Sequence, residues 1–378
     1  MLPLPRPVRA VVRLALASLA VAACEHSSPG RVAGIDHVGP FPTGLPRRLT
    51  FYTGNDRTPS VTGNVLVYAR QGDAYANPLY APEGRELCIA FLPVEGGTIQ
   101  RQLCPHDLIP TTDTLVHTWY EPALSPDGKR IAFVWERGTR VGMLGFLNAY
   151  LMVTPVDQPT DTTQIHYTVN LTQPDDPLSQ LANMATHITW ADSSRLRFIA
   201  TFEHRFKVKG GGAERICDTI WQPLTLMELN LATGTARVVP GGDSVYTYAP
   251  APDGGLWVVR SPDSTALLHL DPATGTTTLV SRFSDIVLDL IAVDGAPVAV
   301  VTPVHDPHVT IFPPTVVRGG AAIERLDPST GSLSRITPFP GLVHRLASVP
   351  GQRYFVAEIE PALMPFGMPP DLWLVEFP

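Results

Sequence analysis

One short pattern recurs along most of this chain: a tight turn followed by a run of apolar residues. Its clearest copy is Ser125–Val134, in which Ser-Pro-Asp-Gly precedes Lys-Arg-Ile-Ala-Phe-Val. We count six copies, the others starting at Ser60, Trp190, Ala251, Ala292 and Ser348. A repeated unit of this size buries its apolar face only by stacking on its neighbours, so the pattern predicts a repeat architecture.

A second turn motif lies downstream of three copies, at Asn230–Thr235, Asp271–Thr276 and Asp327–Ser332. Each has Gly where a hairpin turn needs a positive φ, and each lies between two apolar runs. The unit is therefore a meander of four antiparallel strands. Six such units predict an all-β fold, a six-bladed β-propeller with four-stranded antiparallel blades. The chain length also admits seven blades, and the number six rests on the counted copies.

The two ends of the chain predict how the ring closes. The last unit supplies a third strand at Leu372–Phe377 and then ends, whereas Arg47–Phe51 has the pattern of a fourth strand. We therefore expect the N-terminal strand to complete the sixth blade.

These units resemble the WD-like propeller repeats of the TolB family and of the propeller domain in prolyl-oligopeptidase-type peptidases. The resemblance covers nearly the whole mature chain, with the copy at Ser125 the strongest match. It implies protein partners in the cell envelope. The peptidases carry a separate hydrolase domain with Gly-x-Ser-x-Gly, and this chain has neither that motif nor the residues for such a domain.

The N-terminus has the pattern of a secretory signal. Arg6, Arg9 and Arg13 precede the apolar stretch Leu14–Ala23. The stretch ends in Val-Ala-Ala-Cys24, which resembles the bacterial lipobox and implies lipid attachment at Cys24; the alternative is an ordinary cleavage site with an incidental cysteine. Residues 1–23 are then the signal peptide, 24–45 a flexible tether and 46–378 the propeller.

We expect the exported protein to be anchored to a bacterial membrane. By resemblance to Gram-negative lipoproteins, Glu25 favours the outer membrane, with the propeller in the periplasm or at the cell surface. No later apolar run is long enough to span a bilayer, so the expected membrane contact is through the lipid alone. The formal net charge of −7 argues against nucleic-acid binding.

Export to an oxidising compartment permits a disulfide. Cys88 and Cys104 flank a hairpin signal at Glu95-Gly96-Gly97. If Val94 faces Thr98, paired residue numbers sum to 192, which sets the two cysteines opposite each other. We therefore predict a Cys88–Cys104 disulfide and a buried free thiol at Cys217.

The connections differ between the two faces of the predicted disc. The short Asp-Gly and Thr-Gly turns share one face, whereas the long, irregular segments share the other. Those segments are Gln71–Glu86, Trp135–Asn148, His204–Glu214, Pro303–Gly320 and Glu360–Pro370. Long loops on a rigid scaffold commonly carry recognition, so the second face is the predicted binding face.

The innermost strands start at the same face and line a central funnel. Counting back from the turns predicts a set of funnel or binding residues: Asp56, Glu121, His187, Tyr246, Tyr248, His344 and Arg345. The alternative is that strand starts beside a wet channel are polar without binding anything.

Metal and catalytic motifs are weak. His305 and His308 could ligate a metal, but a polar turn at Pro307 explains them as well. His117, His187 and His344 precede turns of different blades, in registers that differ. We therefore assign no catalytic residue, metal or cofactor.

The leading hypothesis is a non-enzymatic binding or scaffold module of the cell envelope that uses the long-loop face and the funnel. One alternative is a hydrolase or lyase that acts on a sugar or lactone with histidine and carboxylates of the channel. Another is a periplasmic sensor with a small-molecule ligand in the channel.

Overall fold

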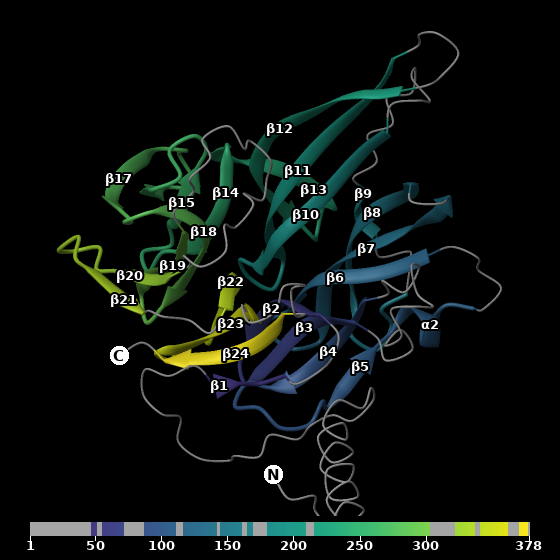
Figure 1. The fold of residues 1–378 in the computed structure, drawn as a ribbon, viewed down its shortest axis with the longest axis horizontal. Coiled ribbons are helices and arrows are strands. Elements are labelled where there is room, and N and C mark those ends of the chain that lie inside the picture. Colours follow the sequence, from purple (N-terminus) through teal and green to yellow (C-terminus); the bar gives the residue numbers. More distant parts are fainter. Residues whose placement is uncertain are drawn as a thin grey trace, which may run out of the picture.

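The chain folds into a ring of six antiparallel sheets, in a computed structural model (Figure 1). Each sheet has four strands; in five sheets they follow the chain order, and in the sixth the order is β22-β23-β24-β1. The structure describes residues 47–50, 55–71, 87–110, 116–141, 144–160, 165–168, 180–208, 215–302, 322–336, 341–361 and 370–376. The predicted six-bladed, all-β propeller is confirmed.

The first three blades extend from residue 56 to residue 243. Blade 1 contains β2 (Asp56–Thr62), β3 (Val65–Gln71), β4 (Leu87–Pro93) and β5 (Arg101–Leu103). A short helix, α2 (Pro105–Leu108), follows it. Blade 2 contains β6 (Val116–Leu124), β7 (Arg130–Val141), β8 (Leu144–Pro155) and β9 (Ile165–Thr168). Blade 3 contains β10 (Gln180–Trp190), β11 (Arg195–Val208), β12 (Arg215–Asn230) and β13 (Thr235–Asp243).

The strands of the other three blades are shorter than the long strands of blades 2 and 3. Blade 4 contains β14 (Val245–Pro250), β15 (Leu256–Arg260), β16 (Ala266–Leu270) and β17 (Thr277–Arg282). Blade 5 contains β18 (Ile286–Val293), β19 (Ala296–Thr302), β20 (Ala322–Leu326) and β21 (Leu333–Ile336). Blade 6 contains β22 (Gly341–Ser348), β23 (Tyr354–Pro361), β24 (Asp371–Glu376) and β1 (Arg47–Arg48).

The N-terminal strand closes the ring, as the sequence predicted. β1 pairs with β24, Arg47 opposite Leu374 and Arg48 opposite Trp373. The amide of Leu49 extends the ladder by donating to the carbonyl oxygen of Leu372 at 2.7 Å. Blade 6 is thus built from both ends of the described chain.

The turn at Ser125 shows why the repeat motif has its residues. The Ser125 hydroxyl donates to the Asp127 carboxylate at 2.6 Å and accepts the Arg130 amide at 2.9 Å. Gly128 adopts a φ of +71°, where a side chain is strained. The motif therefore satisfies the backbone of a tight reversal between β6 and β7 and fixes the register of blade 2.

The described core consists of six apolar clusters, one at each interface between neighbouring blades. Between blades 2 and 3, for example, Leu151 packs in the same cluster as Leu196 and Phe198, and all three are fully buried. Burying each such side chain contributes about 1.5–3 kcal/mol, so the ring is stabilised at its blade interfaces.

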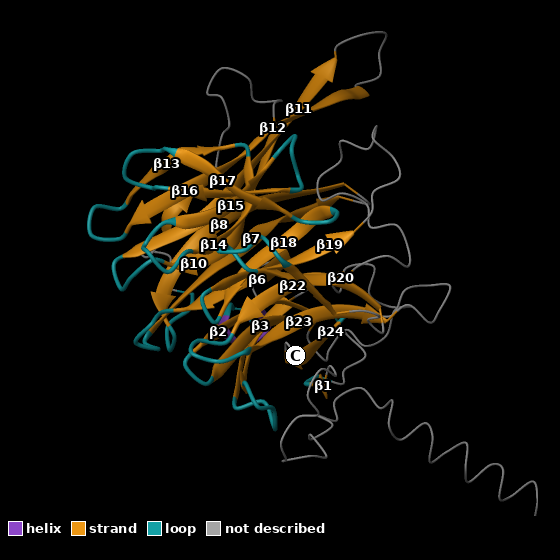
Figure 2. Cartoon of the chain, turned by 90° about the vertical axis from the view of Figure 1, so that its left-hand side faces the viewer, coloured by secondary structure: helices purple, strands orange, loops and turns teal. Residues whose placement is uncertain are grey.

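The structure corrects two of the expected loops. Trp135–Asn148 belongs almost wholly to β7 and β8, whose register pairs Val141 with Leu144. The run from His204 to Val208 is likewise strand, the end of β11, where Val208 pairs with Arg215 of β12. The sequence predicted irregular loops here, whereas the structure continues the paired strands of both hairpins. The β11–β12 hairpin projects beyond the disc, whereas most described turns lie on its left side in Figure 2.

Several expectations fall outside the described residues: the signal peptide, Cys24 and the tether, and most of the segments 71–86, 303–320 and 360–370. The backbone at Cys217 lies in β12. Over the described ranges, no helix has the length and apolar character needed to cross a membrane.

Candidate functional site

Every innermost strand has a register irregularity near the middle of the strand. In blades 1–3 two residues are skipped in the pairing with the second strand: Thr58-Pro59, Glu121-Pro122 and His187-Ile188. Blades 4–6 skip one residue each, Tyr246, Leu288 and His344. Such bulges re-aim side chains, and here they lie at matching positions around the ring.

The first residue of each two-residue bulge has a left-handed backbone. The φ angles of Thr58, Glu121 and His187 are 49°, 52° and 54°. None of the three is glycine, so each conformation costs on the order of 1–3 kcal/mol. Their side chains and amides make the contacts described next, which offset this strain.

Glu121 links three blades. Its Oε1 accepts a hydrogen bond from Nη2 of Arg345 in blade 6 at 2.7 Å, and its Oε2 accepts one from the backbone amide of His187 in blade 3 at 3.0 Å. Both carboxylate oxygens of this largely buried side chain therefore have donors.

Asp289 of blade 5 accepts hydrogen bonds from blades 3, 4 and 6. Its Oδ1 lies 3.0 Å from Nε2 of His187 and accepts the Thr247 hydroxyl at 3.2 Å. Its Oδ2 accepts the backbone amide of Leu346 at 2.6 Å. Because the Thr186 hydroxyl lies 3.0 Å from Nδ1 of His187, both imidazole nitrogens are occupied.

Thr58 adds blade 1. Its hydroxyl accepts the Glu121 amide at 3.3 Å, and its own amide donates to Oε2 of Glu358 at 2.9 Å. Glu358 lies on β23, directly opposite Arg345. We call these residues the axial cluster: Thr58, Glu121, His187, Thr247, Asp289, Arg345 and Glu358. All six blades contribute to it.

The charges of the axial cluster stabilise one another. Burial raises the pKa of Asp289, but the hydrogen bond and charge of His187, the charge of Arg345 and the Leu346 amide outweigh it, so the pKa lies below its usual value. Burial lowers the pKa of Arg345, yet nearby carboxylates bring it above its usual value. Glu358 differs, because burial raises its pKa despite the opposing charge of His344.

The structure brings three of the predicted funnel residues together: Glu121, His187 and Arg345. His344 lies beside them, close enough to influence Glu358. Asp56 lies elsewhere. It is fully buried, and its charged neighbours are Asp371, Arg70 and Arg48, where blade 6 meets blade 1.

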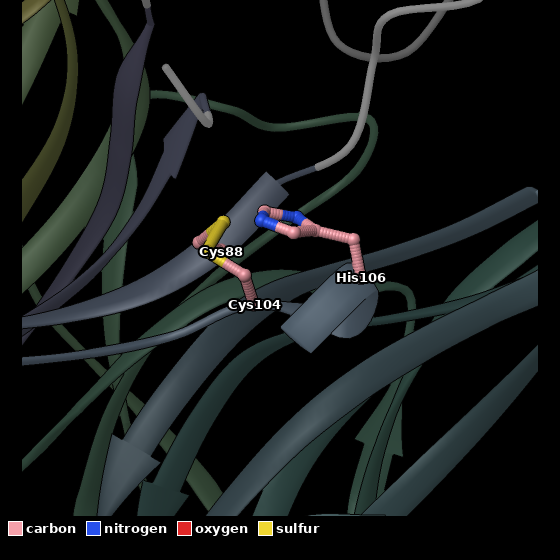
Figure 3. A group of neighbouring side chains, drawn as sticks. All are labelled: Cys88, Cys104 and His106. Carbon is pink, nitrogen blue, oxygen red and sulfur yellow. A yellow bond between two sulfur atoms is a disulfide. The ribbon is translucent and has the colours of Figure 1, made fainter. Parts of the chain in front are cut away.

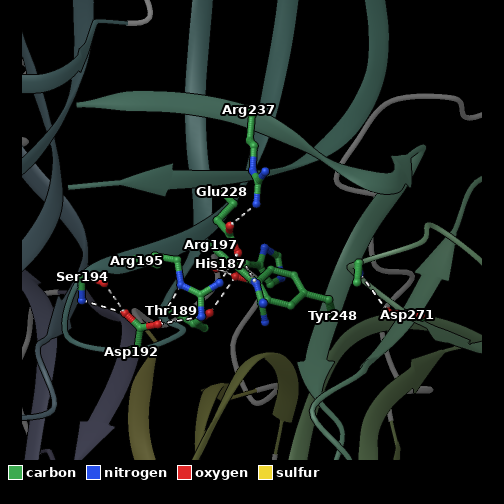
Figure 4. Close-up of polar contacts among 11 residues, drawn as sticks. His187, Thr189, Asp192, Ser194, Arg195, Arg197, Glu228, Arg237, Tyr248 and Asp271 are labelled. Carbon is green, nitrogen blue, oxygen red and sulfur yellow. Dashed lines mark hydrogen bonds and ion pairs between the residues drawn. The ribbon is translucent and has the colours of Figure 1, made fainter. Parts of the chain in front are cut away.

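The two predicted tyrosines connect blades. The Tyr248 hydroxyl donates to the carbonyl oxygen of His187 at 2.8 Å and lies 2.8 Å from the Thr189 hydroxyl, which ties blade 4 to blade 3 (Figure 4). The Tyr246 hydroxyl donates to the carbonyl oxygen of Val287 at 2.8 Å, which ties blade 4 to blade 5. Burial raises the pKa of both, so they serve as neutral hydrogen-bond donors.

An ion-pair cluster lies nearby in blade 3, where three arginines surround Glu228 (Figure 4). Arg197 approaches at 3.2 Å and Arg237 at 3.0 Å, and Arg195 also pairs with Asp192. Arg237 is 72% exposed, so its ion pair adds little net stabilisation, whereas Arg197 and Glu228 are only 14% and 6% exposed.

Two members of the axial cluster were not predicted. Thr58 was missed because the count in blade 1 started from Ser60, which lies inside β2, whereas Ser125 follows the end of β6. Glu358 was missed because it lies on a second strand rather than an innermost one. The pairing of β22 with β23 opposite Arg345 is the signal that could have found it.

The sulfur atoms of Cys88 and Cys104 lie 2.06 Å apart in a disulfide (Figure 3). The strand register agrees with the expected one, because Ile89 pairs with Leu103 and Ala90 with Gln102. His106 lies beside the disulfide, and these three residues form the only His, Cys or carboxylate triad of metal-binding dimensions within the described ranges. With both thiols in the disulfide, no thiolate is available to a metal there.

Comparison with known proteins bears on the fold. No protein-family model matches this chain, and no curated protein sequence matches it. Among solved structures it is similar to the calcium-binding protein regucalcin from Agrobacterium tumefaciens, with 11% identity, a TM-score of 0.49 and coverage of 88% of this chain and 93% of that chain. TolB from Acinetobacter baumannii gives 11% identity and a TM-score of 0.44, with 85% and 79% covered.

A chain of the nidogen/laminin complex gives 10% identity and a TM-score of 0.45, with 77% of this chain and 82% of that chain covered. The structural neighbours thus include TolB, the family that the repeats resemble. At these identities and TM-scores, the similarity transfers no activity.

Proposed function

We propose that this chain is an exported, lipid-anchored binding module of the cell envelope. It holds a protein partner on the face that carries the extended β7–β8 and β11–β12 hairpins. The axial cluster keeps that face rigid. The proposal concerns recognition without catalysis.

The pairing within the axial cluster carries the proposal. A general base or metal ligand needs a nitrogen or oxygen lone pair that is directed at the substrate. His187 has neither nitrogen free, and Glu121 and Asp289 use both carboxylate oxygens for contacts within the protein. A cluster that satisfies its own groups while joining six blades favours a scaffold over a reactive centre.

The uneven length of the blades supports the location of the binding surface. The second and third strands of blade 3 have 14 and 16 residues, whereas those of blade 4 have 5 each. Beyond Thr225, β13 no longer pairs with β12, so the outer part of this hairpin extends past its own fourth strand. An arm on one side of a rigid disc suits recognition of another protein.

The test removes the outer part of the β11–β12 hairpin. Because Ala200 pairs with Thr225, the segment between them can be replaced by Asn-Gly, which closes a two-residue hairpin. Wild-type and trimmed proteins are expressed in the native cells, and their crosslinked partners are identified by mass spectrometry. We expect partners that wild type captures to be lost on trimming.

The matched control changes the opposite rim through Thr274→Ala with Thr330→Ala, two exposed turn residues. This control should keep the partners, and thermal unfolding should show that the trimmed protein is folded. An unchanged set of partners on trimming would contradict the proposed surface.

The anchor is tested separately. Replacing Cys24 by Ala removes the proposed lipid-attachment residue. We expect the variant to move from the membrane fraction to the soluble fraction and to lose incorporation of labelled palmitate. Labelling that persists in the variant would exclude Cys24 as the attachment site.

One observation favours a second candidate, a hydrolase or lyase acting on a sugar or lactone. Strained backbone concentrates at functional sites, and three residues with positive φ meet at the axis. The Arg345 side chain is also 22% exposed, so an anionic ligand could reach it. Hydrolysis of a panel of lactones that is lost in His187→Gln would support this alternative over the binding module.

A further inference from the structure

A pair of buried carboxylates lies where the ring is closed. Asp56 begins β2 of blade 1, and Asp371 begins β24 of blade 6. The Asp56 amide donates to the carbonyl oxygen of Pro370 at 3.0 Å, which brings the two strand starts together. We call this site the seam: Arg48, Thr50, Asp56, Arg70 and Asp371.

Asp56 is fully buried with too few donors for its charge. Neither of its carboxylate oxygens accepts a hydrogen bond within the described structure, and the same holds for Oδ1 of Asp371. The other oxygen of Asp371 pairs with Nη2 of Arg48 at 2.5 Å. The Thr50 hydroxyl lies beside both carboxylates and lowers the pKa of each. Its oxygen accepts the Leu372 amide at 2.9 Å, and its one proton can serve only one carboxylate at a time.

The charged groups that face Asp56 come from three elements among the described residues: Asp371 on β24, Arg48 on β1 and Arg70 on β3. Burial raises the pKa of Asp56 to about 8, and the charge of Asp371 adds to it while the two arginines oppose it. Burial likewise raises the pKa of Asp371 to about 6, opposed by Arg48 and Thr50.

A cation with two charges does not suit this site. Two guanidinium groups already face the carboxylates, so a divalent ion would leave a buried excess of positive charge. A single proton removes the charge of Asp56 and supplies the hydrogen-bond donor that the orphan oxygens lack.

We propose that the buried Asp56 and Asp371 carboxylates hold one proton at the seam, and that losing it to solvent loosens the closure of the ring by β1. When the proton leaves, Asp56 becomes a buried carboxylate without donors beside a second carboxylate. Opening the seam hydrates both charges and breaks the contacts of Leu49 and Leu372. The protein thereby becomes a pH-sensitive ring that is closed most firmly under mildly acidic conditions.

The direction of the pH dependence follows from the difference in the pKa of Asp56 between the opened and the closed seam. In the opened seam Asp56 ionises near the ordinary value of about 4, whereas in the closed ring it ionises near 8. The closing contribution is therefore complete below about pH 4 and falls as the pH rises toward 8. Between these limits the opening equilibrium constant rises by up to about tenfold per pH unit and then levels off.

The experiment is hydrogen exchange on the full-length chain between pH 5 and pH 9, expressed as protection factors. The reporters are the amides of Leu49 and Leu372, and the reference is the amide of Val258 in the core of blade 4. We expect protection at the seam to fall by at least tenfold relative to Val258 between pH 5 and pH 8. Asp56→Asn should remove that difference.

Three results would overturn the proposal. The first is parallel behaviour of seam and reference in wild type, which needs no variant to fold. The second is an Asp56→Asn protein that retains the full wild-type pH dependence. The third is restoration of seam protection at pH 8 by millimolar Ca²⁺, which would make the site a cation site instead.

Discussion

The axial cluster and the seam both bury carboxylates, but they shift the pKa of Asp289 and of Asp56 in opposite directions. At the axis, Asp289 receives a side-chain hydroxyl, an imidazole and a backbone amide, and its pKa is lowered. At the seam, no backbone amide, imidazole or guanidinium of the described residues donates to Asp56, and burial raises its pKa to about 8. Burial is complete for both residues, so the supply of donors decides the protonation state.

The difference shows how a propeller can combine a rigid axial cluster with a seam whose stability depends on pH. Donors from different blades make the axis a fixed joint whose members depend on one another. The seam joins the two ends of the chain with a two-residue strand and an unpaired acid. Substitutions at the two places should therefore change stability in opposite directions.

The largest effect is expected at the axis. Asp289→Ala leaves His187, Thr247 and the Leu346 amide without their acceptor. Removing one partner of a buried charged network costs about 3–5 kcal/mol, and we expect a loss of that size in urea unfolding at pH 7. Asp263→Ala, which removes an exposed pair with Arg282, is the control and should leave the midpoint unchanged. A loss below 1 kcal/mol for Asp289→Ala would mean that the axial cluster does not hold the blades together.

At the seam we expect the substitution to raise the free energy of unfolding instead of lowering it. At pH 8, Asp56→Asn removes a buried charge that has no donor, and we expect the free energy of unfolding to rise by about 1–3 kcal/mol. At pH 5, where Asp56 of the closed ring is already neutral, the gain should be much smaller. Urea unfolding at the two pH values measures both. Destabilisation at pH 8 as large as that of Asp289→Ala would erase the contrast between the sites.

A smaller effect tests the link between the axis and the blade interfaces. Tyr248→Phe keeps the ring in the core of the blade 3–4 interface but removes the donor to the His187 carbonyl. We expect a loss of about 1–2 kcal/mol by thermal or urea unfolding. Tyr246→Phe is the matched variant, because it removes the bond to Val287 without touching an axial residue. Only Tyr248→Phe should also accelerate exchange of the His187 amide.

The smallest effect concerns the exposed side of the seam. Arg48 is 32% exposed, so Arg48→Gln should cost only about 1 kcal/mol or less at pH 8 in thermal unfolding. Loss of the guanidinium should also raise the pKa of Asp371, which a pH series of the same variant can detect. Arg282→Gln serves as the control because its ion pair lies far from the seam in the sequence and is exposed.

The sequence predicted the ring because the repeat is local. Ser125-Pro126-Asp127-Gly128 specifies a turn through contacts within six residues, and the strands follow from apolar alternation. Closure by β1 was predictable because the last unit lacks a fourth strand. The axial cluster was found only in part, since Ser60 lies inside β2 rather than at its turn and Glu358 lies on a second strand.

The nature of the seam was not predictable from sequence for a different reason. Asp56 was expected in the funnel because a polar residue at a strand start usually faces water. Its burial depends on Asp371 and Arg48, which are 315 and 8 positions away and meet it only after the ring has closed. The extended β11–β12 hairpin was missed because its charged residues resemble those of a solvated loop.

The most direct test of this account is a ¹³C NMR titration of the aspartate carboxyl groups in the full-length chain, with Asp56→Asn and Asp289→Asn used to assign the two signals. The account predicts that Asp56 titrates near pH 8 and that Asp289 titrates below its usual range. An Asp56 carboxyl that titrates at or below about 4, alongside Asp289, would contradict it.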